Sequence, residues 1–279
     1  MSLDTLQLLS REIRARVVRT SHRAPVPHLG SCLSCVDILV NCYFEILNID
    51  PDKPTHPNRD RFILSKGHAA PALFQVLAKR GFFPLEQLEH FGADGSYFGE
   101  HPPAPGYLSG VEAATGSLGH GMPMALGMAL AARIKHESYR VVALLSDGEC
   151  NEGSIWESAM LAASQKVSNL AVVVDFNKWQ ATGRSQQVMA LDPLRAKWEA
   201  FGWATEEIDG HDHRAITAAL RPVENRDKPT AVIAHTVKGK GVSFMEDDNN
   251  WHYRTPSAEE LDAALAELGI DSNVLGARP

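Results

Sequence analysis

Two short polar groups along the chain carry the oxygen atoms that a divalent metal ion and a diphosphate would need. Asp147-Gly148-Glu149 follows one apolar run, and Asn177 follows the next. Carboxylate and amide oxygens suit Mg²⁺ or Ca²⁺, and Mg²⁺ usually binds few protein ligands together with phosphate oxygens. Gly148 would let backbone N–H groups approach a diphosphate without a Cβ in the way. Together the two groups indicate a metal and diphosphate site.

The apolar runs themselves must bring these groups together. Residues 141–146 and 171–176 are apolar except for Ser146 and Asp175, as expected of strands buried on both faces of a parallel sheet. Asp147 and Asn177 are 177 − 147 = 30 residues apart, about one strand–helix–strand unit. Ligands bind at the carboxyl ends of such strands, so the two side chains meet if the strands are neighbours. Asp-Gly alone is more often a plain turn, and only the pair indicates a site.

The remaining segments predict an α/β domain. Apolar residues at helical spacing indicate helices over 6–20, 34–47, 68–80, 154–166, 191–200, 213–220 and 257–268. Ser34 is the expected N-cap of the second helix. Further strands are expected over 203–208 and 230–237. The alternation favours one parallel sheet with helices on both faces, in a single domain over residues 1–279 with a helical N-terminal segment.

Composition argues against several other classes of protein. The net charge is −7, which disfavours nucleic acid or an anionic membrane as the main partner. The apolar stretch 122–134 is too short to span a bilayer and contains Arg133. The first residues lack the basic-then-apolar order of a signal peptide. We therefore expect a cytoplasmic protein.

Cys32 and Cys35 have C-x-x-C spacing, which could indicate a redox pair or half of a zinc site. No second pair follows to complete a zinc site. We favour small buried thiols near the start of a helix.

The segments 146–153 and 174–183 closely resemble the thiamine diphosphate signature of transketolases, which starts with G-D-G and closes on an Asn. Here Ser146 takes the place of the first Gly. Two further segments resemble other motifs of that family: 60–68 resembles D-R-F-x-L-S-x-G-H, and 236–245 resembles the segment that leads to a cofactor-side histidine. The likeness covers nearly the whole chain.

The resemblance implies roles for individual residues. It implies a thiamine diphosphate-binding fold in which the metal, Mg²⁺ or Ca²⁺, is held by the side chains of Asp147 and Asn177 and by the carbonyl of Trp179. Gly148 and Glu149 would lie on the cofactor, with Asn177 beside them. Glu152 would be a carboxylate at the subunit interface, and we count it among the catalytic residues.

The segment 115–121 resembles T-G-x-L-G-Q-G, a loop that lies along the cofactor in the family. The resemblance implies that Gly116 and Leu118 contact the aminopyrimidine through their backbone.

Four of the twelve histidines fall on active-site histidines of the family: His28, His68, His101 and His252. By resemblance, His68 and His252 donate to the diphosphate region, and His28 and His101 bind hydroxyls of the donor. His28 and His252 would also relay protons, for which an imidazole with a pKa near neutrality is suited. The histidines without such support are expected to be structural or exposed: His90, His120, His136 and His211.

The chain also departs from the family near the substrate channel. Pro27 replaces a Gly, Leu29 replaces a Pro, His120 replaces a Gln, and Tyr253 replaces a Gly. These changes leave open whether the substrate is an ordinary sugar phosphate.

A full-length transketolase continues into a pyrimidine-binding domain and a C-terminal domain, and residues 1–279 hold neither. We expect the N-terminal subunit of a split transketolase. It would need a separate C-terminal subunit, in an α2β2 assembly with the cofactor at the interface. The expected reaction transfers a two-carbon ketol unit from a ketose to an aldehyde. The alternatives are the α-subunit of a 2-oxo acid dehydrogenase, a subunit that loads a two-carbon unit onto a carrier protein, and a non-catalytic cofactor-binding module.

Overall fold

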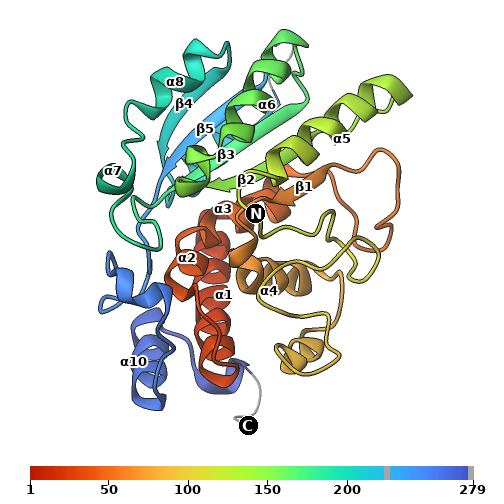
Figure 1. The fold of residues 1–279 in the computed structure, drawn as a ribbon. Coiled ribbons are helices and arrows are strands. Elements are labelled where there is room, and N and C mark those ends of the chain that lie inside the picture. Colours follow the sequence, from red (N-terminus) through yellow and green to blue (C-terminus); the bar gives the residue numbers. More distant parts are fainter. Residues whose placement is uncertain (223–226, 276–279) are drawn as a thin grey trace.

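Five parallel strands form the central sheet of the computed structural model, which describes residues 1–222 and 227–275 (Figure 1). Their order across the sheet is β1-β2-β3-β5-β4, and every neighbouring pair is parallel. The strands are β1 Arg61–Leu64, β2 Val141–Ser146, β3 Leu170–Phe176, β4 Ala204–Asp209 and β5 Thr230–His235. The predicted α/β class and parallel sheet are confirmed.

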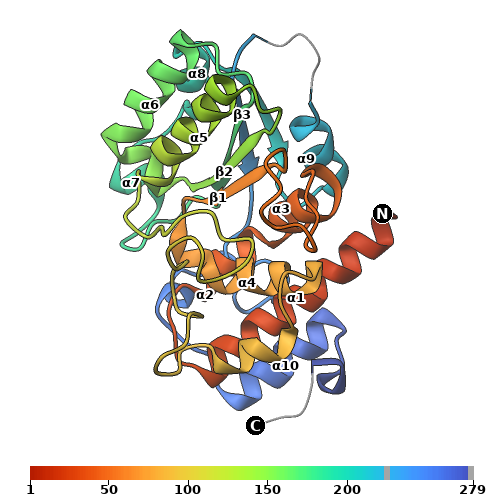
Figure 2. The same cartoon turned by 90° about the vertical axis from the view of Figure 1, so that its right-hand side faces the viewer.

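The sheet is covered by helices on both faces (Figure 2). Successive side chains of a strand point to opposite faces, and β2 shows this directly. Val142 and Leu144 pack into the core beneath the N-terminal helices, whereas Val141, Ala143 and Leu145 pack into the core beneath the later ones. Because both faces are buried, the whole run is apolar. The helices α1 Leu3–Arg23, α2 Leu29–Ser34, α3 Val36–Asn41, α4 Ala70–Arg80, α9 His213–Leu220 and α10 Ala258–Leu268 belong to the first core.

The second core is built mainly by α5 Gly121–Lys135, α6 Gly153–Ser164 and α8 Leu194–Ala200. A single-turn helix, α7 Ser185–Val188, precedes α8. Helix α5 corresponds to the apolar stretch that we had considered only as a membrane span and had not predicted as a helix of the domain. In the described part of the chain no helix is both long and apolar enough to cross a bilayer.

The prediction of one helix over 34–47 with Ser34 as its N-cap was wrong. Ser34 is the last residue of α2, and the helix is interrupted at Cys35 before α3 begins. The hydroxyl of Ser34 donates to Asp175 Oδ2 (2.6 Å) and lies 3.1 Å from the Ser31 carbonyl. The side chain of Ser34, which we had assigned to capping, therefore binds the buried carboxylate of Asp175 on β3.

Cys32 and Cys35 are free and buried, which confirms the interpretation as small core thiols. Burial raises the pKa of both thiols, to about 12 for Cys35. Because the thiolate is the reactive species, native protein should react with a water-soluble aromatic disulfide reagent much more slowly than denatured protein. Rapid native modification of either residue, located by peptide mass mapping, would contradict this burial.

Candidate metal and diphosphate site

Asp147 lies at the carboxyl end of β2 and is bound from three sides. Its Oδ1 accepts from the backbone N–H of Gly148 (2.8 Å), and its Oδ2 accepts from the N–H of Lys178 (2.9 Å) and from Ser185 Oγ (2.7 Å). Burial raises the pKa of this carboxyl to about 6, although the bond from Ser185 opposes the rise. Asp147 is therefore a buried oxygen donor that is held in one position.

Asn177 follows β3, the neighbour of β2, and the next residue, Lys178, is the one that donates to Asp147. The structure thus brings the two predicted ligands to the same edge of the sheet. Asn177 Oδ1 accepts from the N–H of Trp179 (3.0 Å), and Nδ2 donates to Ser34 Oγ (3.4 Å).

The chemistry of these donors fits Mg²⁺ or Ca²⁺. A carboxylate, an amide and the main-chain carbonyl of Trp179 supply only oxygen, the ligand atom that these ions prefer. Within the ranges that the structure describes, no group of three or more His, Cys, Asp or Glu side chains could hold a metal. A site with one carboxylate suits an ion whose other ligands are phosphate oxygens and water. The donor set supports the predicted metal role.

Two buried polar atoms beside this edge lack a protein partner among the described residues: Gln180 Nε2 and His28 Nδ1. Gln180 lies against Gly148, where an added Cβ would come within 3.1 Å of Gln180 Cγ. Buried polar atoms are normally hydrogen-bonded, and so both atoms fit a site built for a polar ligand.

Glu149, which we predicted to contact the cofactor, uses its carboxylate inside the protein. It accepts from the N–H of Gly119 (2.8 Å), the N–H of Ser146 (3.3 Å) and the hydroxyl of Ser65. Burial raises the pKa of Glu149 to about 7, although these hydrogen bonds act to lower it. Glu149 thereby fastens the loop 115–121 to the ends of β1 and β2.

The loop held by Glu149 carries Gly116 and Leu118. Gly116 has a φ of +151°, and a Cβ there would lie 2.7 Å from His101 Cδ2. Glycine is therefore required where the loop passes His101. Leu118 is half-buried, and its carbonyl accepts from Nδ1 of the exposed His120 (3.1 Å).

The four predicted histidines come from four separate segments and gather around His28. The ring centroids lie 4.8 Å (His252), 5.3 Å (His68) and 6.2 Å (His101) from that of His28. The backbone N–H of His28 donates to the carbonyl of His252 (2.6 Å), which joins two of these segments. The fold therefore brings these histidines into one cluster.

Three of these imidazoles are neutral at pH 7. Burial, followed by the charges of His101 and Lys238, lowers the pKa of His28 to about 4. Burial and Lys238 lower the pKa of His252 to about 3. Burial and then Lys66 hold the pKa of His68 well below its usual range. A neutral imidazole can both donate and accept a proton, as a relay requires.

Two buried lysines in this region were not predicted from the sequence. Lys66 donates to the Ser31 carbonyl (2.9 Å) and to Asp175. Lys238 donates to Asn249 Oδ1 (2.6 Å) and lies 3.2 Å from His252 Nδ1. Burial, followed by repulsion from Lys66, lowers the pKa of Lys238 to about 8. Both lie inside segments that we had singled out, and the available signal was a lysine followed directly by glycine.

Glu152 is exposed at the N-cap of α6, with its Cβ close to Gly119. This exposure is compatible with the predicted interface role, which stays a prediction. Among the other histidines, His90, His120 and His136 are exposed. His211 is structural, since it bonds Asp37 Oδ2 (2.8 Å) and accepts from the N–H of Val237 (2.9 Å).

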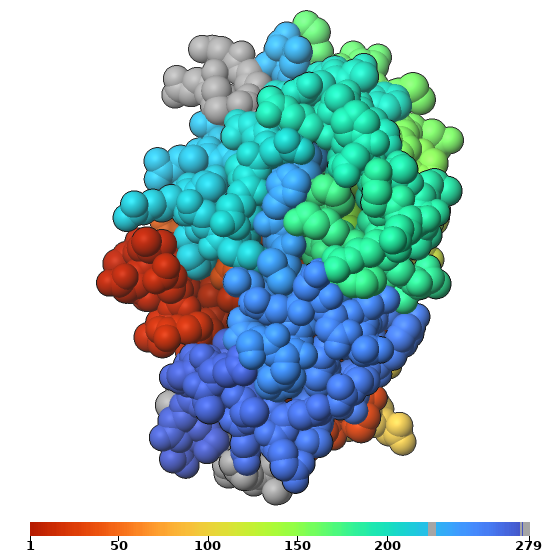
Figure 3. Space-filling model, turned by 90° about the vertical axis from the view of Figure 1, so that its left-hand side faces the viewer, coloured from red at the N-terminus to blue at the C-terminus, as the bar shows by residue number. Residues whose placement is uncertain are grey.

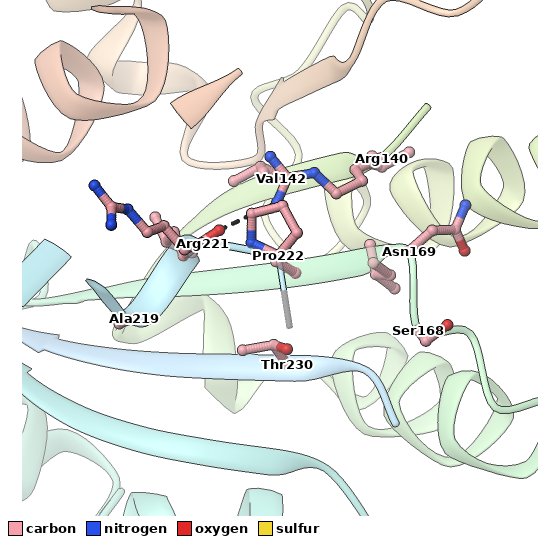
Figure 4. Close-up of a pocket in the computed structure, with 12 residues that line it drawn as sticks. Arg140, Val142, Ser168, Asn169, Ala219, Arg221, Pro222 and Thr230 are labelled. Carbon is pink, nitrogen blue, oxygen red and sulfur yellow. Dashed lines mark hydrogen bonds between the residues drawn. The ribbon is translucent and has the colours of Figure 1, made fainter. Parts of the chain in front are cut away.

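A separate hollow of about 260 Å³ lies at the opposite, amino edge of the sheet, near Arg140 and Thr230 (Figure 4). The guanidinium of Arg140 donates to the carbonyls of Leu220 and Ile46 (3.1 Å each). The hollow lies where the strands begin, whereas Asp147 lies where β2 ends. The two are therefore separate sites, and Arg140 in the hollow is already hydrogen-bonded within the protein.

Comparison with known proteins places this geometry in context. The profile of the family described as "Transketolase, thiamine diphosphate binding domain" matches residues 6–275. The chain is 39% identical over 269 residues to one of the subunits of the apulose-4-phosphate transketolase of Phocaeicola vulgatus, covering 96% of this chain and 95% of that protein. It is 38% identical over 264 residues to the 6-deoxy-6-sulfo-D-fructose transketolase subunit SqwG of a Clostridium species, covering 94% and 96%.

The fold is also similar to that of solved transketolases. The transketolase of Campylobacter jejuni superposes with a TM-score of 0.90 at 29% identity, covering 98% of this chain but 44% of that chain. The present chain thus corresponds in length to these two proteins that are named as transketolase subunits, and to less than half of the Campylobacter jejuni chain.

Proposed function

This chain belongs to the transketolase family, as a thiamine diphosphate-binding domain, and on that premise we propose that it is the N-terminal subunit of a split transketolase. It would transfer a two-carbon ketol unit from a ketose donor to an aldehyde acceptor. The observation that carries this proposal is the cluster of four histidines close to the edge where Asp147 and Asn177 meet.

Thiamine diphosphate, when bound, supplies the nucleophilic carbon that allows the C–C bond beside a ketose carbonyl to break. The chain's own residues provide binding and electrostatics. Asp147, Asn177 and the carbonyl of Trp179 would hold the metal. Lys238 and His68 would face the diphosphate, with Gly148 beside them.

Proton handling falls to the histidine cluster. His28 and His101 would bind hydroxyl groups of the donor. His28 and His252, with ring centroids 4.8 Å apart, would pass a proton as the ketol bond breaks and forms. The close contact of Lys238 with His252 Nδ1 leaves Nε2 of that ring to carry its proton toward the ligand.

The names of the relatives support a proposal for the class of donor. Those named above act, by their names, on a phosphorylated and a sulfonated ketose. We propose a ketose with an anionic end group as the first donor to test. The 2-oxo acid dehydrogenase alternative shares the metal motif but not the set of histidine-bearing segments, and no observation favours it or the carrier-loading alternative. A cytoplasmic location and the absence of nucleic-acid partners stay predictions.

We propose that the pyrimidine-binding half of the site comes from a separate chain, in an α2β2 assembly with the cofactor at the interface. The length match to relatives that are named as subunits, each almost fully covered by this chain, supports this. The exposed Glu152 is the carboxylate that we place at that interface.

The purified chain should therefore show no ketol transfer by itself and gain it when the partner chain is added. Calorimetric titration of thiamine diphosphate with Mg²⁺ should give weak binding to the isolated chain and tight binding with the partner. A coupled assay of aldehyde release from ketose donors would then measure turnover. Full turnover by this chain alone would contradict the split site, and decarboxylation of 2-oxo acids with inert ketoses would favour the dehydrogenase alternative.

A further inference from the structure

Two loops from distant parts of the chain meet over the edge of the sheet where Asp147 and Asn177 lie. The metal loop, residues 177–185, contains two of the proposed ligands, and the histidine loop, residues 245–252, ends at His252. In the space-filling view, the green surface of the first region borders the blue surface of the second (Figure 3). Asn249 Nδ2 donates to the Ala181 carbonyl (3.1 Å), which is one direct link between them.

Asp247 makes the stronger link. Its Oδ1 accepts from the indole N–H of Trp179 (2.8 Å), and its two oxygens accept from both terminal nitrogens of Arg184 (2.6 and 2.5 Å). The guanidinium of Arg184 also stacks on the Trp179 ring, with Cζ 3.7 Å from the centroid. The indole is therefore held both at its N–H and on its face. We call the side chains of Trp179, Arg184 and Asp247 the latch.

The latch holds the residue whose carbonyl is the proposed third metal ligand. Around Trp179 the metal loop forms a tight hairpin, with Gln180 N–H donating to the Gly183 carbonyl (2.8 Å) and Ser185 N–H to the Lys178 carbonyl (3.0 Å). Trp179 and Arg184 also form an isolated β-bridge. With the hairpin closed and the indole fixed, the direction of the Trp179 carbonyl is fixed as well.

The latch is not explained by overall stability. Arg184 and Asp247 are 36% and 55% exposed, and exposed ion pairs contribute little to folding. Asp247 nevertheless adopts a left-handed backbone with φ +58°, which is uncommon for a non-glycine residue. Backbone strain of this kind is often kept at functional sites.

We propose that Asp247 and Arg184 are positioning residues that aim the Trp179 carbonyl at the metal. Asn249, which contacts both Ala181 and Lys238, adds a second link between the two loops. This inference rests on the proposed thiamine diphosphate function.

The test compares metal-dependent cofactor binding in two latch variants, Asp247→Asn and Arg184→Met, with wild type in the assembled enzyme. We expect each variant to bind thiamine diphosphate with Mg²⁺ about 10-fold more weakly, the effect typical of residues that orient a metal ligand. With Ca²⁺ the loss should be smaller, because Ca²⁺ tolerates a less regular geometry. The melting temperature without cofactor should stay within about 1 °C of wild type, since the pair is exposed.

The control is Arg195→Met, which removes an equally exposed ion pair with Glu199 on α8. It should leave binding and metal preference unchanged. Arg184→Lys, which keeps the charge but not the flat bidentate group, should recover only part of the Mg²⁺ affinity. If both latch variants bind the cofactor as tightly as wild type, with an unchanged ratio of the affinities in Mg²⁺ and Ca²⁺, the inference about the latch is overturned and the proposed function is not. Absence of cofactor binding in the wild-type enzyme would overturn the proposed function first.

Discussion

The Asp147→Asn variant is expected to lose at least about 100-fold in affinity for thiamine diphosphate with Mg²⁺, since even residues behind a metal ligand contribute 10- to 100-fold. The exchange keeps the size of the side chain and removes its charge, and Asp147 is the one carboxylate in the proposed ligand set. Isothermal titration of the assembled enzyme with the cofactor, at fixed Mg²⁺, measures the change directly.

The fold of this variant must be checked separately, because Asp147 also accepts hydrogen bonds from Lys178 and Ser185. Circular dichroism and the melting temperature of the cofactor-free protein serve this purpose. Asp94→Asn, an exposed loop carboxylate, is the matched control. If the folded Asp147→Asn protein binds the cofactor with wild-type affinity, the metal is held by other residues.

The Lys66→Met variant should lower the free energy of unfolding by about 3–5 kcal/mol, the usual cost of leaving one partner of a buried ion pair alone. Lys66 and Asp175 are both fully buried, and each would be an uncompensated charge without the other. Urea denaturation followed by circular dichroism gives the value. The exposed Lys135→Met on α5 should change it by less than about 0.5 kcal/mol.

The pH dependence of this ion pair has a definite sign. Burial alone would lower the pKa of Lys66, but the charge of Asp175 outweighs it and raises the pKa above its ordinary value. The contribution of Lys66 is therefore complete at neutral pH and is lost only as strongly alkaline pH deprotonates the folded protein. A double variant, Lys66→Met with Asp175→Leu, should recover part of the lost stability because neither charge is left. A single-variant loss below about 1 kcal/mol would show that Asp175 does not depend on Lys66.

The convergence of Asp147 and Asn177 at one edge of the sheet could be predicted from sequence because its signals are local. Asp147 and Asn177 each follow a mainly apolar run, and the structure places those runs side by side as β2 and β3. The strand β1 was missed because it has only four residues and begins with Arg61, too short a stretch for periodicity to show. The histidine cluster was predicted only through the family resemblance, since no spacing rule relates His28 to His252.

The interactions that could not be predicted join residues far apart in the chain. Lys66 pairs with Asp175, 109 positions away, and Arg184 pairs with Asp247, 63 positions away. Such pairs depend on the order of strands and the path of loops after the sheet has formed. The broken helix near Ser34 has the same origin, because a local capping preference gave way to a buried carboxylate from β3.

The hydrogen bonds of Glu149 have a consequence for the thermodynamics of ligand capture. One carboxylate anchors the loop 115–121 to the ends of two strands, and all of these hydrogen bonds are made by the chain's own residues. Ordering a loop at the moment of binding costs conformational entropy, and a loop that is already ordered avoids that cost. The part of the site that carries Gly116 and Leu118 is therefore preorganised, and the entropic penalty of binding falls on other segments.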